Sequence, residues 1–141
     1  MNRLTISGFI SAALLLWGLS AAANREPASP HPGKRVYDRW CIDCHGDEPG
    51  FFGDGLTGTT ALEAKYGGQI PAVLEKRTDL TPPFVALFVR RGVSVMPFFR
   101  RTEISDAELV ALTAYLSRIS IKDADRALRA VTASSVPPPK Q

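Results

Sequence analysis

The pentapeptide Cys41–Ile42–Asp43–Cys44–His45 is the most informative stretch of this sequence. It holds the only two cysteines of the chain, two residues apart, and a histidine follows the second one. Two thiols one helical turn apart can form thioethers with the two vinyl groups of one porphyrin edge, and the adjacent imidazole can bind the iron. The spacing therefore predicts one covalent c-type haem, with thioethers to Cys41 and Cys44 and with His45 as an axial ligand.

Three other uses of the two cysteines are weaker interpretations. A Cys41–Cys44 disulfide would close a very small loop and would remove little entropy from the unfolded chain. A thioredoxin-like redox pair requires a βαβ context, which the flanking sequence does not show. A zinc site would need His31 together with Cys41, Cys44 and His45, but the adjacent Cys44 and His45 cannot easily face one tetrahedral ion.

The composition narrows the possible functions further. The chain has 141 residues, which is enough for one small domain. It contains two Cys, two His and two Met, too few for iron–sulfur clusters or for typical four-ligand zinc sites. The net charge is +3 and no long basic run is present, so we expect no binding to nucleic acid.

Residues 1–23 have the pattern of a signal peptide. Arg3 supplies a positive start, residues 4–19 carry no charge and are mostly apolar, and small residues precede a cleavage site near Ala23. A retained membrane helix is the alternative, although polar residues dilute the apolar run. We expect a soluble protein that is periplasmic or otherwise exported and that has no stable membrane insertion after cleavage.

The rest of the chain predicts a small all-α domain with long loops, because no stretch alternates with a period of two. We expect a proline-rich lead-in at 24–32, the domain at 33–121 and a partly disordered C-terminal extension at 122–141. Local start and stop signals predict helices at 33–41, 61–66, 82–91, 106–119 and 122–131, and a loop at 46–60.

Met96 is the predicted second axial ligand. It is the only methionine left once the signal peptide is removed, and Pro97 biases it away from helix. A thioether is a soft ligand that suits iron in a one-electron carrier. The alternatives are that Met96 only fills core space, or that His31 binds the iron from a proline-rich segment that has little to fix it. With both axial positions filled, the chain is expected to have no catalytic site of its own.

The haem is also expected to be the main element of the core, because the domain is short and rich in loops. A group of apolar and aromatic residues at helical spacing is expected to pack on or around it. These residues are Val36, Tyr37, Trp40, Phe84, Leu87, Phe88, Leu112 and Leu116.

Arginine and phenylalanine side chains bracket Met96 on both sides. Arginine pairs bidentately with carboxylates, so these residues could hold the haem propionates or face an acidic patch on a partner. The phenylalanines would supply the apolar centre of that interface. Solvated surface charge is the alternative. The candidate residues are Arg90, Arg91, Phe98, Phe99, Arg100 and Arg101.

The motif at 41–45, the Met96–Pro97 pair and the helix around 112–116 together resemble the small monohaem cytochromes c. The resemblance covers residues 33–119. It implies a helical fold wrapped around one covalent haem c, and one-electron transfer as the activity.

A narrower resemblance links the segments 71–81, 89–98 and 103–109 to the cytochrome subunit of the 4-alkylphenol methylhydroxylases, the group of p-cresol methylhydroxylase and eugenol hydroxylase. It implies an FAD-containing oxidoreductase subunit as partner, which oxidises a para-alkylphenol and passes electrons singly to the haem. A downstream acceptor would then take them. The alternative is a freely diffusing periplasmic cytochrome that serves several dehydrogenases and a terminal oxidase.

Overall fold

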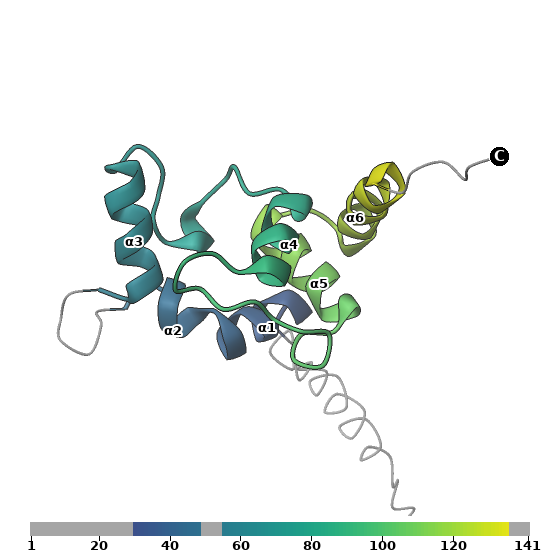
Figure 1. The fold of residues 1–141 in the computed structure, drawn as a ribbon, viewed down its shortest axis with the longest axis horizontal. Coiled ribbons are helices and arrows are strands. Elements are labelled where there is room, and N and C mark those ends of the chain that lie inside the picture. Colours follow the sequence, from purple (N-terminus) through teal and green to yellow (C-terminus); the bar gives the residue numbers. More distant parts are fainter. Residues whose placement is uncertain (1–29, 49–54, 136–141) are drawn as a thin grey trace, which may run out of the picture.

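The computed structural model describes residues 30–48 and 55–135, and within these ranges the fold is all-α, as predicted (Figure 1). The one β feature in the described ranges is an isolated bridge between Val93 and Met96. The elements are α1 (Pro32–Trp40), α2 (Ile42–His45), α3 (Thr57–Tyr66), the short 3₁₀ helix η1 (Leu74–Lys76), α4 (Pro82–Arg91), α5 (Asp106–Ser117) and α6 (Ile121–Ser135).

Helices α1 and α5 cross in close contact at Gly33. A Cβ atom at this position would lie 2.0 Å from the carbonyl oxygen of Ala111 and 2.6 Å from the Cβ of Tyr115. Only glycine lets the two backbones approach so closely. The approach brings the fully buried side chains of Tyr37 and Leu112 into the centre of the fold.

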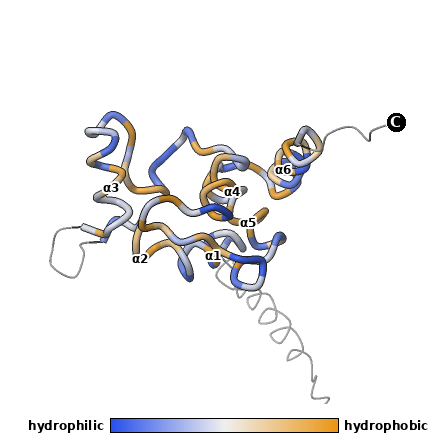
Figure 2. Tube along the Cα trace, viewed as in Figure 1, coloured by the Kyte–Doolittle hydropathy of each residue, from blue (hydrophilic) through white to orange (hydrophobic). Residues whose placement is uncertain are grey.

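The core is built by side chains from α1, α4 and α5 and from the segments before α4 and α5. Figure 2 shows hydrophobic residues concentrated along α4 and α5. Four of the residues expected around the haem belong to this core, namely Val36, Tyr37, Leu112 and Leu116. By contrast, Phe84 and Leu87 are exposed on α4. The core members are Val36, Tyr37, Leu80, Val85, Val89, Ile104, Leu109, Leu112 and Leu116.

Helix α5 begins at Asp106, as predicted, and a capping box at Ser105 starts it. The Ser105 hydroxyl accepts from the backbone N–H of Glu108, and the Glu108 carboxylate accepts from the backbone N–H of Ser105. The helix ends earlier than expected, because Arg118 adopts a left-handed conformation with φ 55°. Ile119 therefore lies outside the helix and is exposed, whereas the sequence predicted it as the last helical residue.

Other helix boundaries also differ from the predictions. Helix α3 begins at Thr57, so the predicted loop at 46–60 is wrong over its last residues. Helix α1 begins at Pro32, because proline is well suited to the first position of a helix. Helix α6 continues to Ser135 and packs on α4 and α5, with Ala124 fully buried.

The predicted signal peptide at 1–23, the glycine-rich stretch 49–54 and the end of the chain at 136–141 lie outside the described residues. Within the described ranges, every helix is too short or too polar to cross a membrane.

The crossing of α1 and α5 gives a first prediction. Gly33→Ala should lower the free energy of unfolding by about 3 kcal/mol, because its methyl group would force the two backbones apart. Gly67→Ala is the matched control, since a Cβ there meets open space and the cost is only that of its left-handed φ, about 1 kcal/mol. Urea denaturation of the purified protein compares the two. If both variants lose the same free energy of unfolding, α1 and α5 can move apart at little cost.

Candidate functional site

The pentapeptide at 41–45 spans the junction between α1 and α2. Cys41 ends α1, and its backbone N–H donates to the Tyr37 carbonyl at 2.8 Å. The carbonyl of Cys41 then accepts from the N–H groups of Cys44 and His45, at 3.1 and 2.9 Å. The two cysteines therefore lie one helical turn apart, as the motif predicts.

The structure supports none of the three alternative uses of these cysteines. Both are free thiols, so no disulfide joins them. Burial raises the pKa of the Cys41 thiol to about 12, with a smaller effect from Cys44, whereas a redox-active thiol needs a lowered pKa. Within residues 30–48 and 55–135, no three His, Cys, Asp or Glu side chains are grouped to hold a metal ion, which contradicts the zinc interpretation.

The half-buried imidazole of His45 lies against the first turn of α3. A Cβ on Gly58 would lie 2.5 Å from its Cε1 and 2.6 Å from its Nδ1. The Nδ1 atom is buried and has no hydrogen-bond partner among the described residues. Burial also lowers the pKa of His45, which favours the neutral imidazole that binds metals. Because α3 covers the Nδ1 edge of the ring, Nε2 is the nitrogen left to bind a metal ion, which is compatible with the predicted role of His45 as a haem ligand.

Two hydroxyl groups fix the backbone around His45. The fully buried Tyr37 donates its hydroxyl proton to the His45 carbonyl at 2.8 Å. The Thr59 hydroxyl, from α3, donates to the Gly46 carbonyl at 2.9 Å. The sequence predicted Tyr37 in the core but did not predict the hydrogen bond of its hydroxyl group. It gave no role to Thr59, because residues 57–60 were predicted as part of a loop.

Met96 is presented by a tight turn. Val93 and Met96 exchange two backbone hydrogen bonds, at 3.1 and 2.9 Å, and Ser94 between them has φ 53°. Gly92 precedes the turn with φ 66°, and a Cβ there would lie 2.6 Å from the Met96 carbonyl oxygen. Met96 itself is half-buried. The prediction that it lies outside any helix is confirmed.

An aromatic contact connects the Met96 loop to the cysteine motif. Phe99 meets Trp40 edge to face, with ring centroids 5.8 Å apart. Trp40 is the last residue of α1 and directly precedes Cys41. The backbone N–H of Phe99 also donates to the Val89 carbonyl at 2.8 Å, which ties the loop to α4. The structure therefore brings the two predicted ligand-bearing segments together within a few residues of each ligand.

His31 is held far from the motif. Its Nδ1 accepts from the backbone N–H of Gly33 at 3.0 Å and caps α1, while its ring stacks on Tyr115 at 5.6 Å. The expectation that little fixes His31 is thus wrong. The nine residues of α1 separate it from Cys41, and about 13 Å of helix rise lies between them. His31 is not placed to compete with Met96.

The candidate arginines divide into different roles. Arg90 donates to the carbonyls of Phe99 and Ile104, at 3.0 and 2.8 Å, and pairs with Asp106 at 2.8 Å. Arg101 also pairs with Asp106, and together the two guanidinium groups lower the pKa of that carboxyl, Arg101 more strongly. Arg90 therefore acts as an internal brace for the loop that follows Met96.

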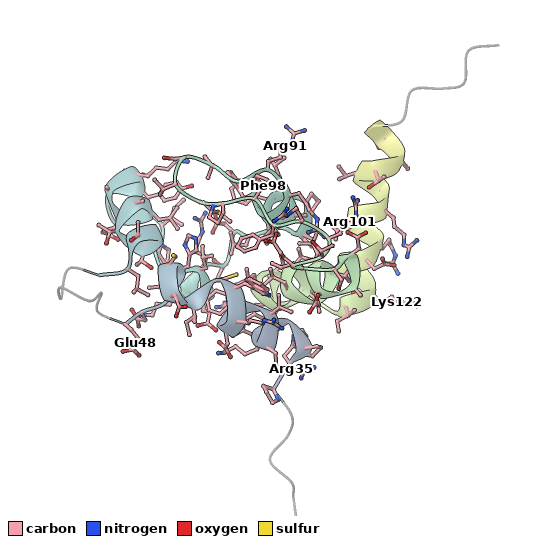
Figure 3. The ribbon with its side chains drawn as sticks, turned by 60° about the horizontal axis from the view of Figure 1, so that its bottom comes forward. Arg35, Glu48, Arg91, Phe98, Arg101 and Lys122 are labelled. Atoms are coloured by element: carbon pink, nitrogen blue, oxygen red, sulfur yellow. The ribbon has the colours of Figure 1, made fainter. Side chains whose placement is uncertain are left out.

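The remaining candidates lie nearer the surface. Arg100 is largely exposed and pairs loosely with Glu103 at 3.6 Å. Phe99 is half-buried against Trp40, whereas Phe98 is 59% exposed. Arg91 is exposed, and Figure 3 shows it on the same side of the molecule as Phe98.

A buried arginine that sequence reasoning missed stabilises the segment between α3 and α4. The side chain of Arg77 is only 3% exposed, donates to both carboxylate oxygens of Asp79 and lies over the Tyr66 ring, 5.0 Å from its centroid. Nothing in the local sequence distinguishes Arg77 from the surface arginines, so only the fold could reveal it.

Comparisons with known proteins agree with this arrangement. A family model described as cytochrome C oxidase, cbb3-type, subunit III matches residues 28–116, which include the pentapeptide and Met96. The chain is also similar to 4-cresol dehydrogenase (hydroxylating) cytochrome c subunit of Pseudomonas putida. The two are 27% identical over 121 residues, which cover 84% of this chain and 86% of that protein. No solved structure gives a significant match.

The different roles of the arginines can be tested by single substitutions. Arg90→Ala should lower the free energy of unfolding by about 2–3 kcal/mol, because it leaves the carbonyl groups of Phe99 and Ile104 without their donor and removes one of the two arginines that pair with Asp106. Arg100→Ala should cause no measurable change, because its ion pair is long and exposed. Urea denaturation measures both. If Arg90→Ala unfolds at the wild-type urea concentration, the hydrogen bonds and the ion pair of Arg90 contribute nothing to stability.

Proposed function

The chain belongs to the cytochrome c family whose model matches residues 28–116, and from this premise we propose that it carries electrons from a flavoprotein to a downstream acceptor. Electron transport on haem c is the coarse function that the family implies. The identity of the donor, the single covalent haem and its ligands are the proposal. The observation that best supports the proposed haem site is the contact between Phe99 and Trp40, because this contact joins the segments that bear His45 and Met96.

The residues present fit a covalent haem. Cys41 and Cys44, free and one turn apart, would form the thioethers, and His45 and Met96 would be the axial ligands. The bound haem iron would supply a one-electron couple between its ferric and ferrous states. The chain would hold the ligands rigidly, His45 through α1 and α3 and Met96 through the 92–99 loop, and would exclude water with the aromatic rings beside them.

The donor that we propose is an FAD-containing oxidoreductase subunit that oxidises a para-alkylphenol. The support is the similarity to a protein whose name describes the cytochrome c subunit of a cresol dehydrogenase. That similarity extends over most of both chains, so it is not limited to the haem motif. We expect this chain to accept the electrons one at a time and to have no catalytic site of its own.

The surface that would dock the donor lies at the tip of the Met96 loop. Val95 and Phe98 flank Met96 and Pro97. Their side chains are 77% and 59% exposed, which is unusual for large apolar side chains so close together. Arg91 adds an exposed positive charge on the same side. This arrangement provides an apolar centre and a cationic rim, which fits a partner with an acidic patch.

Ligation and function are tested on the exported protein. Met96→Ala should abolish the weak ferric charge-transfer band of a methionine-ligated haem and lower the reduction potential, because a soft ligand is lost. Wild-type protein purified from its native host should carry flavin in a stable complex. An unchanged band would exclude Met96 as the ligand, and a flavin-free cytochrome reduced equally by several dehydrogenases would favour the freely diffusing alternative.

The docking surface is tested by truncating two exposed apolar side chains, one at the Met96 loop and one on α6. Phe98→Ala should slow electron transfer from the reduced flavoprotein at least several-fold, since it removes the apolar centre of the interface. Val131→Ala, which truncates an apolar side chain that is 52% exposed on α6, is the matched control and should transfer at the wild-type rate. Stopped-flow measurements of haem reduction give both rates. Equal rates for the two variants would place the interface elsewhere.

A further inference from the structure

The first turn of α3 lies against the imidazole of His45 with no room for a side chain between them. A Cβ at Gly58 would lie 2.5 Å from Cε1 and 2.6 Å from Nδ1 of His45, and 2.7 Å from the Cys44 carbonyl oxygen. The carbonyl belongs to the backbone of α2, so it cannot move aside like the end of a flexible side chain. Any residue other than glycine would displace either α3 or the ring.

The backbone at Gly58 does not itself require glycine. Its φ is not in the left-handed region, unlike that of Gly55 or Gly67. Inside a helix, glycine is less favourable than alanine because the unfolded chain has more freedom to lose. Glycine at this position therefore weakens α3. What it makes possible is the close packing of the α3 backbone on the His45 ring.

Other contacts fix the rest of the ligand residue. Tyr37 holds the His45 carbonyl through its hydroxyl, and Thr59 holds the next carbonyl, that of Gly46. The backbone is thus held by α1 and α3, while the ring is held by the bare backbone at Gly58. Because α3 covers the Nδ1 edge, Nε2 is the nitrogen left for a metal ion.

We propose that Gly58 is a positioning residue for His45, which sets the orientation of the imidazole against the haem, and that the Tyr37 hydroxyl supports it by fixing the His45 carbonyl. The proposal rests on the proposed role of His45 as a haem ligand. Groups in contact with a metal ligand orient it and tune the metal, so a shifted ring changes the electronic structure of the iron. This change would be seen in the spectra of the ferric protein alone, so its measurement does not depend on electron transfer to a partner.

The experiment compares ferric holoproteins by electron paramagnetic resonance and by the hyperfine-shifted haem methyl signals in proton NMR. Gly58→Ala should shift the g values and the methyl resonances, because the new methyl group tilts the ring. Ala64→Gly is the matched control: it weakens the same helix at an exposed position more than one turn beyond Gly58 and should leave both spectra unchanged.

Tyr37→Phe keeps the test decisive if Gly58→Ala fails to mature. It retains the buried ring and removes only the hydroxyl bond to the His45 carbonyl, so the same resonances should shift to a smaller extent. Spectra of Gly58→Ala and Tyr37→Phe that superimpose on the wild type would overturn the proposal. A wild type without a low-spin ferric spectrum, or an unchanged spectrum in His45→Ala, would instead contradict the ligand assignment itself.

Discussion

The close approach of α1 and α5 at Gly33 is the constraint on which the rest of the structure depends. It places α1 firmly on the core, and α1 then carries three features of the candidate site along its length. Tyr37 holds the His45 carbonyl, Trp40 receives Phe99 from the Met96 loop, and Cys41 begins the cysteine motif. A shift of α1 would therefore disturb both predicted ligand segments at once, which is why a contact far from the motif matters to it.

Much of the fold could be predicted because its signals are local. The capping box at Ser105 and the proline after Thr81 start helices at the expected residues, since a cap depends on only a few neighbouring positions. The motif at 41–45 could be interpreted for the same reason: two residues between cysteines fix one turn. Patterns of this kind survive folding because no distant residue has to complete them.

Features that depend on distant partners could not be predicted. Helix α3 begins at Thr57 without a capping side chain and with Gly58 in its first turn, so its sequence has the appearance of a loop. Its packing on His45 supplies what local propensity lacks. In the same way, the sequence shows four arginines around Met96, but only the fold shows that Arg90 reaches the carbonyls of Phe99 and Ile104.

The structure separates the two tasks of an electron carrier. The proposed ligand residues, His45 and Met96, should change position little when the iron changes charge, and rigid elements serve this purpose. Here His45 is held by helices on two sides, and the loop beyond Met96 is braced by Arg90 and Phe99. The tip of the same loop, with Val95 and Phe98, is left exposed although exposed apolar groups favour aggregation. This risk of aggregation is removed if a partner protein covers the tip. The same loop would then hold Met96 rigidly and place it next to the surface where the partner binds.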